Sequence, residues 1–131
     1  MPDHSELSAQ EAKALSFHLA EKNDILVVSL IGAICKATEE IMRRCTEEIE
    51  RSQARSVVLN FLGVENVEKA GLTELAKVQV LVRRKPSALR ICFMRPAVAA
   101  VLKDSGVLRP EEVSAGLKEA IVGLAFKRAA A

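Results

Sequence analysis

The side chains of this chain that could do chemistry form no set typical of an enzyme. Two histidines occur, His4 near the N-terminus and His18 in a predicted strand, and neither has a second candidate base or metal ligand close to it in the sequence. The glycine-rich phosphate-binding motifs, the Gly-x-Ser-x-Gly motif of hydrolases and the His-Glu-x-x-His metal motif are all missing from the sequence. We therefore expect no catalysis, no cofactor and no bound metal.

The three cysteines are the remaining candidates for reactive groups. Cys35, Cys45 and Cys92 are an odd number, lie far apart and sit in apolar or amphipathic stretches, which is typical of buried thiols in a reducing compartment. Cys35 has an alternative role, because it falls in a predicted loop near a helix N-terminus with Lys36 beside it, an environment that favours a reactive thiolate. Thiol chemistry at Cys35 is kept as an alternative to a structural role.

Composition limits the kind of partner. The chain has 131 residues, of which half are hydrophobic, and its net charge of +2 lacks the positive surplus that phosphate binding usually needs. Only 3% of the residues are aromatic, with no Trp or Tyr, so few side chains could stack on bases. The longest uncharged apolar stretch, residues 25–35, is too short to cross a bilayer, and the N-terminus does not read as a signal peptide. We expect a cytoplasmic protein with no nucleic-acid partner and no transmembrane segment.

Several stretches have the composition of β-strands. Residues 17–21 alternate apolar and polar side chains, and an Asn-Asp turn separates them from the β-branched run 25–31, which predicts a hairpin. Because this run is apolar at nearly every position, its strand is expected to be covered on both faces. Residues 56–62 and 89–94 are predicted as further strands, and a loop is expected at 63–66.

Helical periodicity predicts four helices between and after these strands. Thr38 is expected to cap the first helix, because glutamates occupy its first turn and apolar residues recur at four-residue steps. The second helix is expected to carry Leu72, Leu75, Val78 and Val82 on its apolar side, and basic residues followed by a proline end it. The predicted helices span residues 38–52, about 70–85, 96–105 and, after Pro110, a stretch with Val113, Leu117, Ile121 and Leu124 as its apolar stripe.

The order of these elements predicts the fold class. After the first hairpin, strands and helices alternate, which implies right-handed crossovers and mostly parallel pairing. We predict an α/β fold with a mixed sheet of four or five strands and helices packed mainly on one face. The single domain is expected over residues 16–126, with 1–15 as a tail or weak helix and 127–131 as a short tail.

Four segments of the chain carry a pattern that can be compared with a known family. They are Ile25–Gly32 with Thr38 at the following helix, Val57–Val64, Val67–Leu72, and Pro96–Val98 through Ser105–Val107. In their order and separations they resemble the STAS domain, the family named for sulfate transporters and anti-sigma-factor antagonists. The resemblance extends over about residues 17–125, and the apolar framework carries more of it than the chemical signature does.

This chain departs from the family at the residues that carry its chemistry. In the STAS signature, an Asp is followed by a Ser that a partner kinase phosphorylates, and the unmodified loop is what the partner grips. Here Glu68 stands in place of the Asp, Lys69 in place of the Ser, and Ala70 follows before Gly71. An acid that the family usually has after its first interior strand is replaced by Cys35. The resemblance implies that the fold brings these two loops close together beside the N-terminus of the second helix. No side chain from Glu68 to Ala70 offers a hydroxyl to a kinase.

The resemblance implies a non-catalytic interaction module in a bacterial regulatory or scaffold assembly. Its partner would be a protein, either kinase-like, as anti-sigma factors are, or a scaffold, and association with a second copy stays open. The expected contact residues come from the two loops and the helices after them: Glu68, Lys69, Ala70, Gly71, Thr73, Cys35, Lys36 and Thr38. Because Lys69 adds positive charge near a helix N-terminus, the loop should favour an acidic partner and need no phosphorylation there.

Other interpretations stay open at this point. Lys69 could instead mark a site that has lost its function, and Thr73 or Thr38 could be modified in place of the missing serine. We interpret Thr73 as a hydroxyl on a helix face and Thr38 as a cap. The alternative function is a small-ligand or lipid-binding component of a transport assembly, for which the alanines in the last two helices would leave room.

Overall fold

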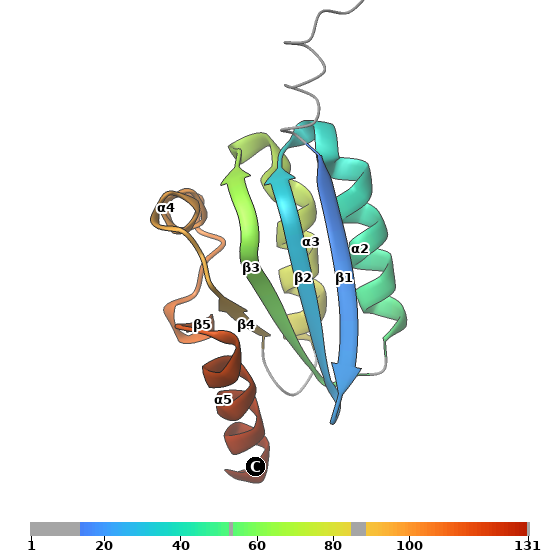
Figure 1. The fold of residues 1–131 in the computed structure, drawn as a ribbon, viewed down its shortest axis with the longest axis vertical. Coiled ribbons are helices and arrows are strands. Elements are labelled where there is room, and N and C mark those ends of the chain that lie inside the picture. The colour runs from blue at the N-terminus through green and yellow to red at the C-terminus, as the bar shows by residue number, and fades with distance from the viewer. Residues whose placement is uncertain (1–13, 53, 85–88, 131) are drawn as a thin grey trace, which may run out of the picture.

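A five-stranded sheet forms the centre of the molecule (Figure 1). The structure, a computed structural model, describes residues 14–52, 54–84 and 89–130, with side chains as far as Leu124. The strands are β1 (Leu15–Lys22), β2 (Ile25–Ile34), β3 (Ser56–Val67), β4 (Leu89–Cys92) and β5 (Val113–Ser114), in that order across the sheet. β1 is antiparallel to β2, and all other neighbours are parallel. The predicted α/β fold with a mixed sheet is confirmed.

The hairpin between β1 and β2 is formed as predicted. Asn23 and Asp24 both have positive φ angles, of 54° and 67°, as a two-residue type I′ turn requires. β1 begins at Leu15, two residues before the strand predicted from Phe17, and residues 1–13 of the expected N-terminal tail lie outside the described residues.

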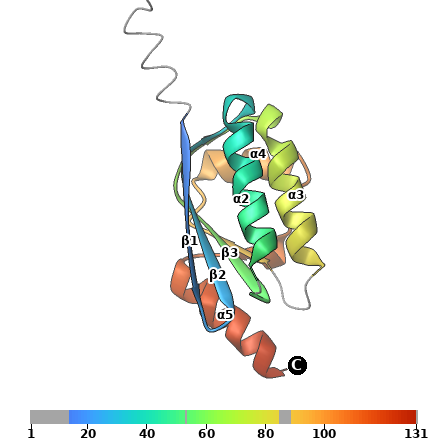
Figure 2. The ribbon, with the colours of Figure 1, turned by 90° about the vertical axis from the view of Figure 1, so that its right-hand side faces the viewer.

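Three helices cover one face of the sheet. α2 (Glu39–Arg51) and α3 (Leu72–Arg83) lie side by side there, as Figure 2 shows, and α4 (Pro96–Asp104) adds Val98 and Leu102 to the same core. Alternate strand residues point into this layer, including Val57, Leu59 and Ile91. The prediction that helices pack mainly on one face is therefore confirmed.

α5 (Leu117–Ala130) packs on the other face. Its Ala120 and Leu124 contact a smaller cluster that includes Val58 and Cys92, the strand residues that alternate with those of the main core. α5 continues to Ala130, so residues 127–130, expected as a tail, extend the helix; alanine, lysine and arginine favour helix, and no proline or glycine interrupts them.

The prediction of a loop at residues 63–66 is wrong, because β3 continues to Val67. Val64 and Val67 are buried, and β2 pairs with this extension as far as Ile34, with register shifts near Ile31 and Gly32. Gly63 permits the close approach, since a Cβ there would lie 2.8 Å from Cγ1 of Ile31. The apolar valines thus extend the strand through a stretch whose glycine and asparagine suggested a loop.

The last helix begins later than predicted, at Leu117 rather than just after Pro110. Residues Pro110–Glu112 form a short 3₁₀ turn, η3, and Val113 then pairs with Ile91 in β5 rather than joining a helical stripe. Pairing with β4 satisfies backbone groups that would otherwise be exposed at the sheet edge, and α5 begins only after Gly116.

Candidate functional site

Two loops meet at the carboxyl ends of β2 and β3. Since these strands are parallel, both loops leave the sheet at the same edge. The first leads through the 3₁₀ turn η1 (Lys36–Thr38) into α2, and the second through η2 (Lys69–Gly71) into α3. The backbone N–H of Glu68 donates a hydrogen bond of 2.8 Å to the carbonyl of Ile34, which joins the second loop to the first. The sequence-based expectation that these loops come together is correct.

Thr38 organises the first loop from inside. It is buried, its hydroxyl donates to the carbonyl of Ala33 at 2.8 Å, and its Oγ1 accepts the N–H of Cys35 at 3.0 Å. Thr38 is the N-cap residue of α2, as predicted, but its side chain makes no capping hydrogen bond to that helix. The helical path starts earlier, at Lys36, and Cys35 is the residue that precedes it. Thr38 instead closes the turn between β2 and α2.

Cys35 lies inside this junction rather than on an open loop. Its side chain is only 2% exposed, and its sulfur lies 3.7 Å from Oγ1 of Thr38. A thiol this buried meets dissolved reagents poorly, so the structure gives thiol chemistry at Cys35 no support. Its small apolar side chain fills the space where the two loops join.

Gly71 is the point of closest approach between the loops. A Cβ built on Gly71 would lie 2.6 Å from both the Cα and the backbone N of Cys35. Backbone atoms cannot move aside as a flexible side chain can, so only glycine fits at this position without separating the loops. The close contact between Gly71 and Cys35 depends on the pairing of segments that are distant in sequence. From the sequence alone, Gly71 was recognised only as part of the Gly-Leu signature.

The outer surface of the joined loops consists of exposed residues with two cations. Lys36 and Lys69 are exposed and occupy the first turns before α2 and α3, where the helix dipoles add positive potential. Within the described residues neither lysine forms an ion pair, and Glu68 is the acidic residue adjacent to Lys69. Ala70 and Thr73 are exposed beside them. We call Lys36, Glu68, Lys69, Ala70 and Thr73 the loop surface.

A buried charge lies beneath this end of the molecule. The carboxylate of Glu74 on α3 is 2% exposed, and its Oε1 lies 2.9 Å from Nζ of Lys77 and 3.8 Å from Nε of Arg43 on α2. The two cations compensate the cost of burying the carboxylate and tie α2 to α3. Sequence analysis did not identify this cluster, because Glu74 occupies an ordinary helix position.

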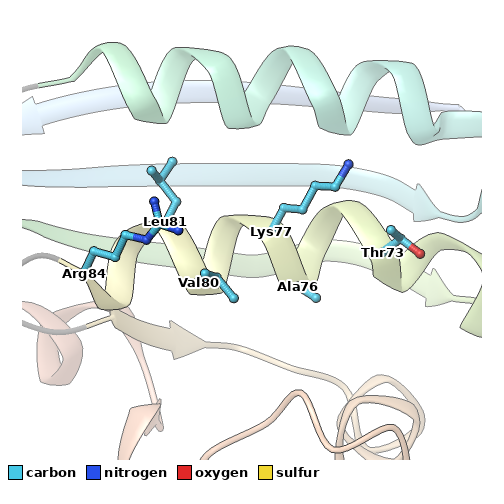
Figure 3. A pocket seen from close by; sticks show the side chains of 6 residues that line it. All are labelled: Thr73, Ala76, Lys77, Val80, Leu81 and Arg84. Atoms are coloured by element: carbon cyan, nitrogen blue, oxygen red, sulfur yellow. The ribbon is translucent and has the colours of Figure 1, made fainter.

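An open hollow of about 330 Å³ follows α3 away from the loop surface (Figure 3). Sequence analysis assigned the apolar side of this helix to Leu72, Leu75, Val78 and Val82, all of which are buried as predicted. The hollow lies elsewhere on the helix and away from the alanines that suggested room for a ligand. Its lining residues are Thr73, Ala76, Lys77, Val80, Leu81 and Arg84.

The described residues contain no group of three or more His, Cys, Asp or Glu side chains that could hold a metal ion. Likewise, no helix in the described part of the chain is long and apolar enough to cross a membrane.

Comparison with known proteins assigns the fold to a family. The model of the STAS domain matches residues 16–120. The chain belongs to the STAS domain family. It is 24% identical over 96 residues to the anti-sigma F factor antagonist of Paenibacillus polymyxa, a match that covers 72% of this chain and 82% of that protein.

Two solved structures show the same STAS fold. An anti-sigma factor antagonist from Mycobacterium paratuberculosis matches with a TM-score of 0.76 at 16% identity, over 86% of this chain and 96% of that one. The murine anion transporter Slc26a9 matches with a TM-score of 0.73 at 15% identity, over 93% of this chain and 24% of the transporter. The fold therefore occurs both as a separate antagonist protein and as part of a transporter, and the surface residues must distinguish between such roles.

Proposed function

We propose that this STAS domain is a non-catalytic module that binds an acidic protein partner through the loop surface, within a regulatory or scaffold assembly. The observation that carries the proposal is the joined pair of loops, held rigid by Gly71 and Thr38 and presenting Lys36 and Lys69 outward. A fixed backbone lowers the ordering cost of binding. The relative in Paenibacillus polymyxa, an anti-sigma F factor antagonist, supports an anti-sigma-factor type of partner.

We propose that partner binding does not depend on phosphorylation of this loop. Glu68, Lys69 and Ala70 carry no hydroxyl, and Lys69 places a permanent positive charge where a phosphoserine would bring roughly −1.5 to −2 charges. Thr73, the second residue of α3, has the exposed hydroxyl closest in sequence to the loop, and we interpret it as a contact residue rather than a phosphate acceptor.

Binding to an anti-sigma-factor homologue, measured with and without Mg-ATP, tests the proposal. We expect equal affinity in both conditions, no phosphate in the chymotryptic peptide that spans residues 62–72, and amide shifts centred on residues 36–38 and 68–71. Loss of binding after ATP treatment, or shifts that avoid both loops, would contradict it.

A ligand-binding role is the second candidate. The observation that favours it is the exposed apolar pair Ile31 and Leu62 on the sheet face that α5 leaves uncovered at this end. Native mass spectrometry separates the two functions, because a ligand or lipid carrier should retain bound mass after mild purification. A protein-binding module should give the mass of the chain alone.

A further inference from the structure

The outer face of α3 carries a continuous stripe of small and apolar side chains. Thr73, Ala76, Val80 and Leu81 recur at steps of three and four residues and line the open hollow (Figure 3), which places them on one side of the helix. Val80 is 52% exposed although it is a large apolar residue in the middle of the helix. We call Thr73, Ala76, Lys77, Val80, Leu81 and Arg84 the α3 stripe.

The two charged side chains that line the hollow, Lys77 and Arg84, are exposed cations. Nζ of Lys77 lies 2.9 Å from the buried carboxylate of Glu74, the only acid in α3, and already compensates it. Within the described residues, Arg84 forms no ion pair. The surface along this helix is therefore apolar at its centre and cationic at its margins, and it complements an apolar ridge flanked by carboxylates.

The charge pattern also argues against a second copy of this chain as the occupant. Two α3 stripes placed face to face would bring Lys77 and Arg84 of each copy together. α2 has acidic residues on its surface, but its large apolar side chains, Met42 and Ile49, are buried in its own core. Neither helix offers an exposed apolar ridge with flanking acids.

We propose that the α3 stripe binds an amphipathic helix of the protein partner, with that helix's apolar side chains on Ala76, Val80 and Leu81 and its acidic residues opposite Lys77 and Arg84. From Thr73 to Arg84 the stripe is about 16 Å long, enough for three turns of a partner helix. Thr73 belongs to both surfaces, so a partner bound at Lys69 can continue along α3. The inference rests on the proposed function in that the same partner contacts both surfaces.

A pair of synthetic peptides tests the inference directly. Each is an 18-residue amphipathic helix with leucines at steps of three and four residues; one carries glutamates on its flanks, and its twin carries lysines at the same places. Titrated into ¹⁵N-labelled protein, the glutamate peptide is expected to shift amides of residues 73–84 and to bind at least tenfold more tightly than the lysine peptide.

Two matched variants locate the binding. Val80→Glu should weaken binding of the glutamate peptide at least tenfold, whereas Val122→Glu on α5, which makes the same change at a helix residue 57% exposed, should leave it unchanged. Both positions are exposed, and a well-dispersed amide spectrum confirms that each variant folds. Equal binding of the two peptides, no binding, shifts centred on Ile31 and Leu62, or an equal effect of both variants would overturn the inference.

Lys69→Glu distinguishes this inference from the proposed function when the protein partner itself is the ligand. If Lys69→Glu weakens partner binding and Val80→Glu does not, the loop surface binds the partner and the α3 stripe proposal fails. If only Val80→Glu weakens partner binding, the α3 stripe binds the partner and the proposal for the loop surface fails.

Discussion

At the scale of single residues, Gly71 is a position where the loop packing leaves no room for a side chain. We expect Gly71→Ala to destabilise the protein by about 1–3 kcal/mol, because the new methyl group would press on the backbone of Cys35. Urea denaturation measures the change. Gly123→Ala in α5 is the matched control: its Cβ would have only ordinary contact, 3.8 Å from Nε of Arg90, and alanine favours helix by up to about 1 kcal/mol. Equal effects of the two substitutions would show that the loops do not pack as described.

The burial of two thiols should make the free energy of unfolding depend on pH in the alkaline range. Burial raises the pKa of Cys45 to about 12 and that of Cys92 to about 11, with Glu48 and Glu119 adding to the effect. The unfolded chain ionises its thiols near pH 9, so above that pH the folded state holds more protons than the unfolded state. The free energy of unfolding should therefore fall as the pH rises from about 9 to about 11.

Urea denaturation at pH 8, 9 and 10 measures that fall. Cys45→Ala, which removes one of the thiols, should be less stable at pH 8 because of the cavity it leaves, yet lose less stability between pH 8 and 10 than the unmodified protein. A slope unchanged by the substitution would contradict the assigned cause.

At the scale of elements, the turn between β2 and α2 depends on one hydroxyl. Thr38→Val keeps the shape of the side chain but leaves the buried N–H of Cys35 and the carbonyl of Ala33 without their partner, so we expect a loss of about 1–3 kcal/mol. Thr38→Ser keeps the hydroxyl and should retain most of the stability. The midpoint of thermal unfolding compares the two, and equal midpoints would argue against this hydrogen-bond network.

An ion pair joins α3 to the segment before β5. Arg83 donates two hydrogen bonds, of 2.7 and 3.0 Å, to the buried carboxylate of Glu112. Glu112→Ala should cost about 2–3 kcal/mol in the free energy of unfolding. The surface pair Glu48 and Arg51 is the control, because both side chains are exposed and Glu48→Ala should cost less than about 0.5 kcal/mol. Similar losses for the two variants would show that Glu112 does not anchor this segment.

The elements that could be predicted from sequence are those whose signals are local. Helical periodicity placed the buried face of α3, and the Asn-Asp turn placed the hairpin. The extension of β3 to Val67 and the two residues of β5 depend on pairing with distant strands, so local composition did not indicate them. The same reason explains the role of the Thr38 side chain, since its hydrogen-bond partners lie in the preceding strand and turn rather than in the helix that follows.

The candidate site could be predicted in part. The STAS-like order of segments brought the Cys35 and Lys69 loops together, as the structure has them. Burial of the three cysteines was the favoured expectation from sequence, and Cys35, Cys45 and Cys92 are all buried. The exposed side of α3 needed the tertiary structure, because it depends on which residues the neighbouring segments cover.

At the scale of the whole molecule, charge is divided between surfaces. The net charge is only +2. The loop surface carries two lysines and one glutamate, and the α3 stripe carries one lysine and one arginine, whereas α2 carries five glutamates and three arginines. Under the proposed function, this distribution would direct an acidic partner to the loop end and α3 rather than to α2. The scarcity of aromatic residues means that backbone, aliphatic side chains and charge must supply this chain's contribution to binding.

The most direct test of this account is a charge reversal at Lys69, with affinity for an anti-sigma-factor homologue measured by isothermal titration calorimetry. We predict that Lys69→Glu weakens binding at least tenfold, or about 1.4 kcal/mol, and that the affinity of the unmodified protein falls as salt is added. Lys103→Glu, an equal charge change at an exposed position on α4, should bind as the unmodified protein does. Unchanged affinity for Lys69→Glu would contradict the account.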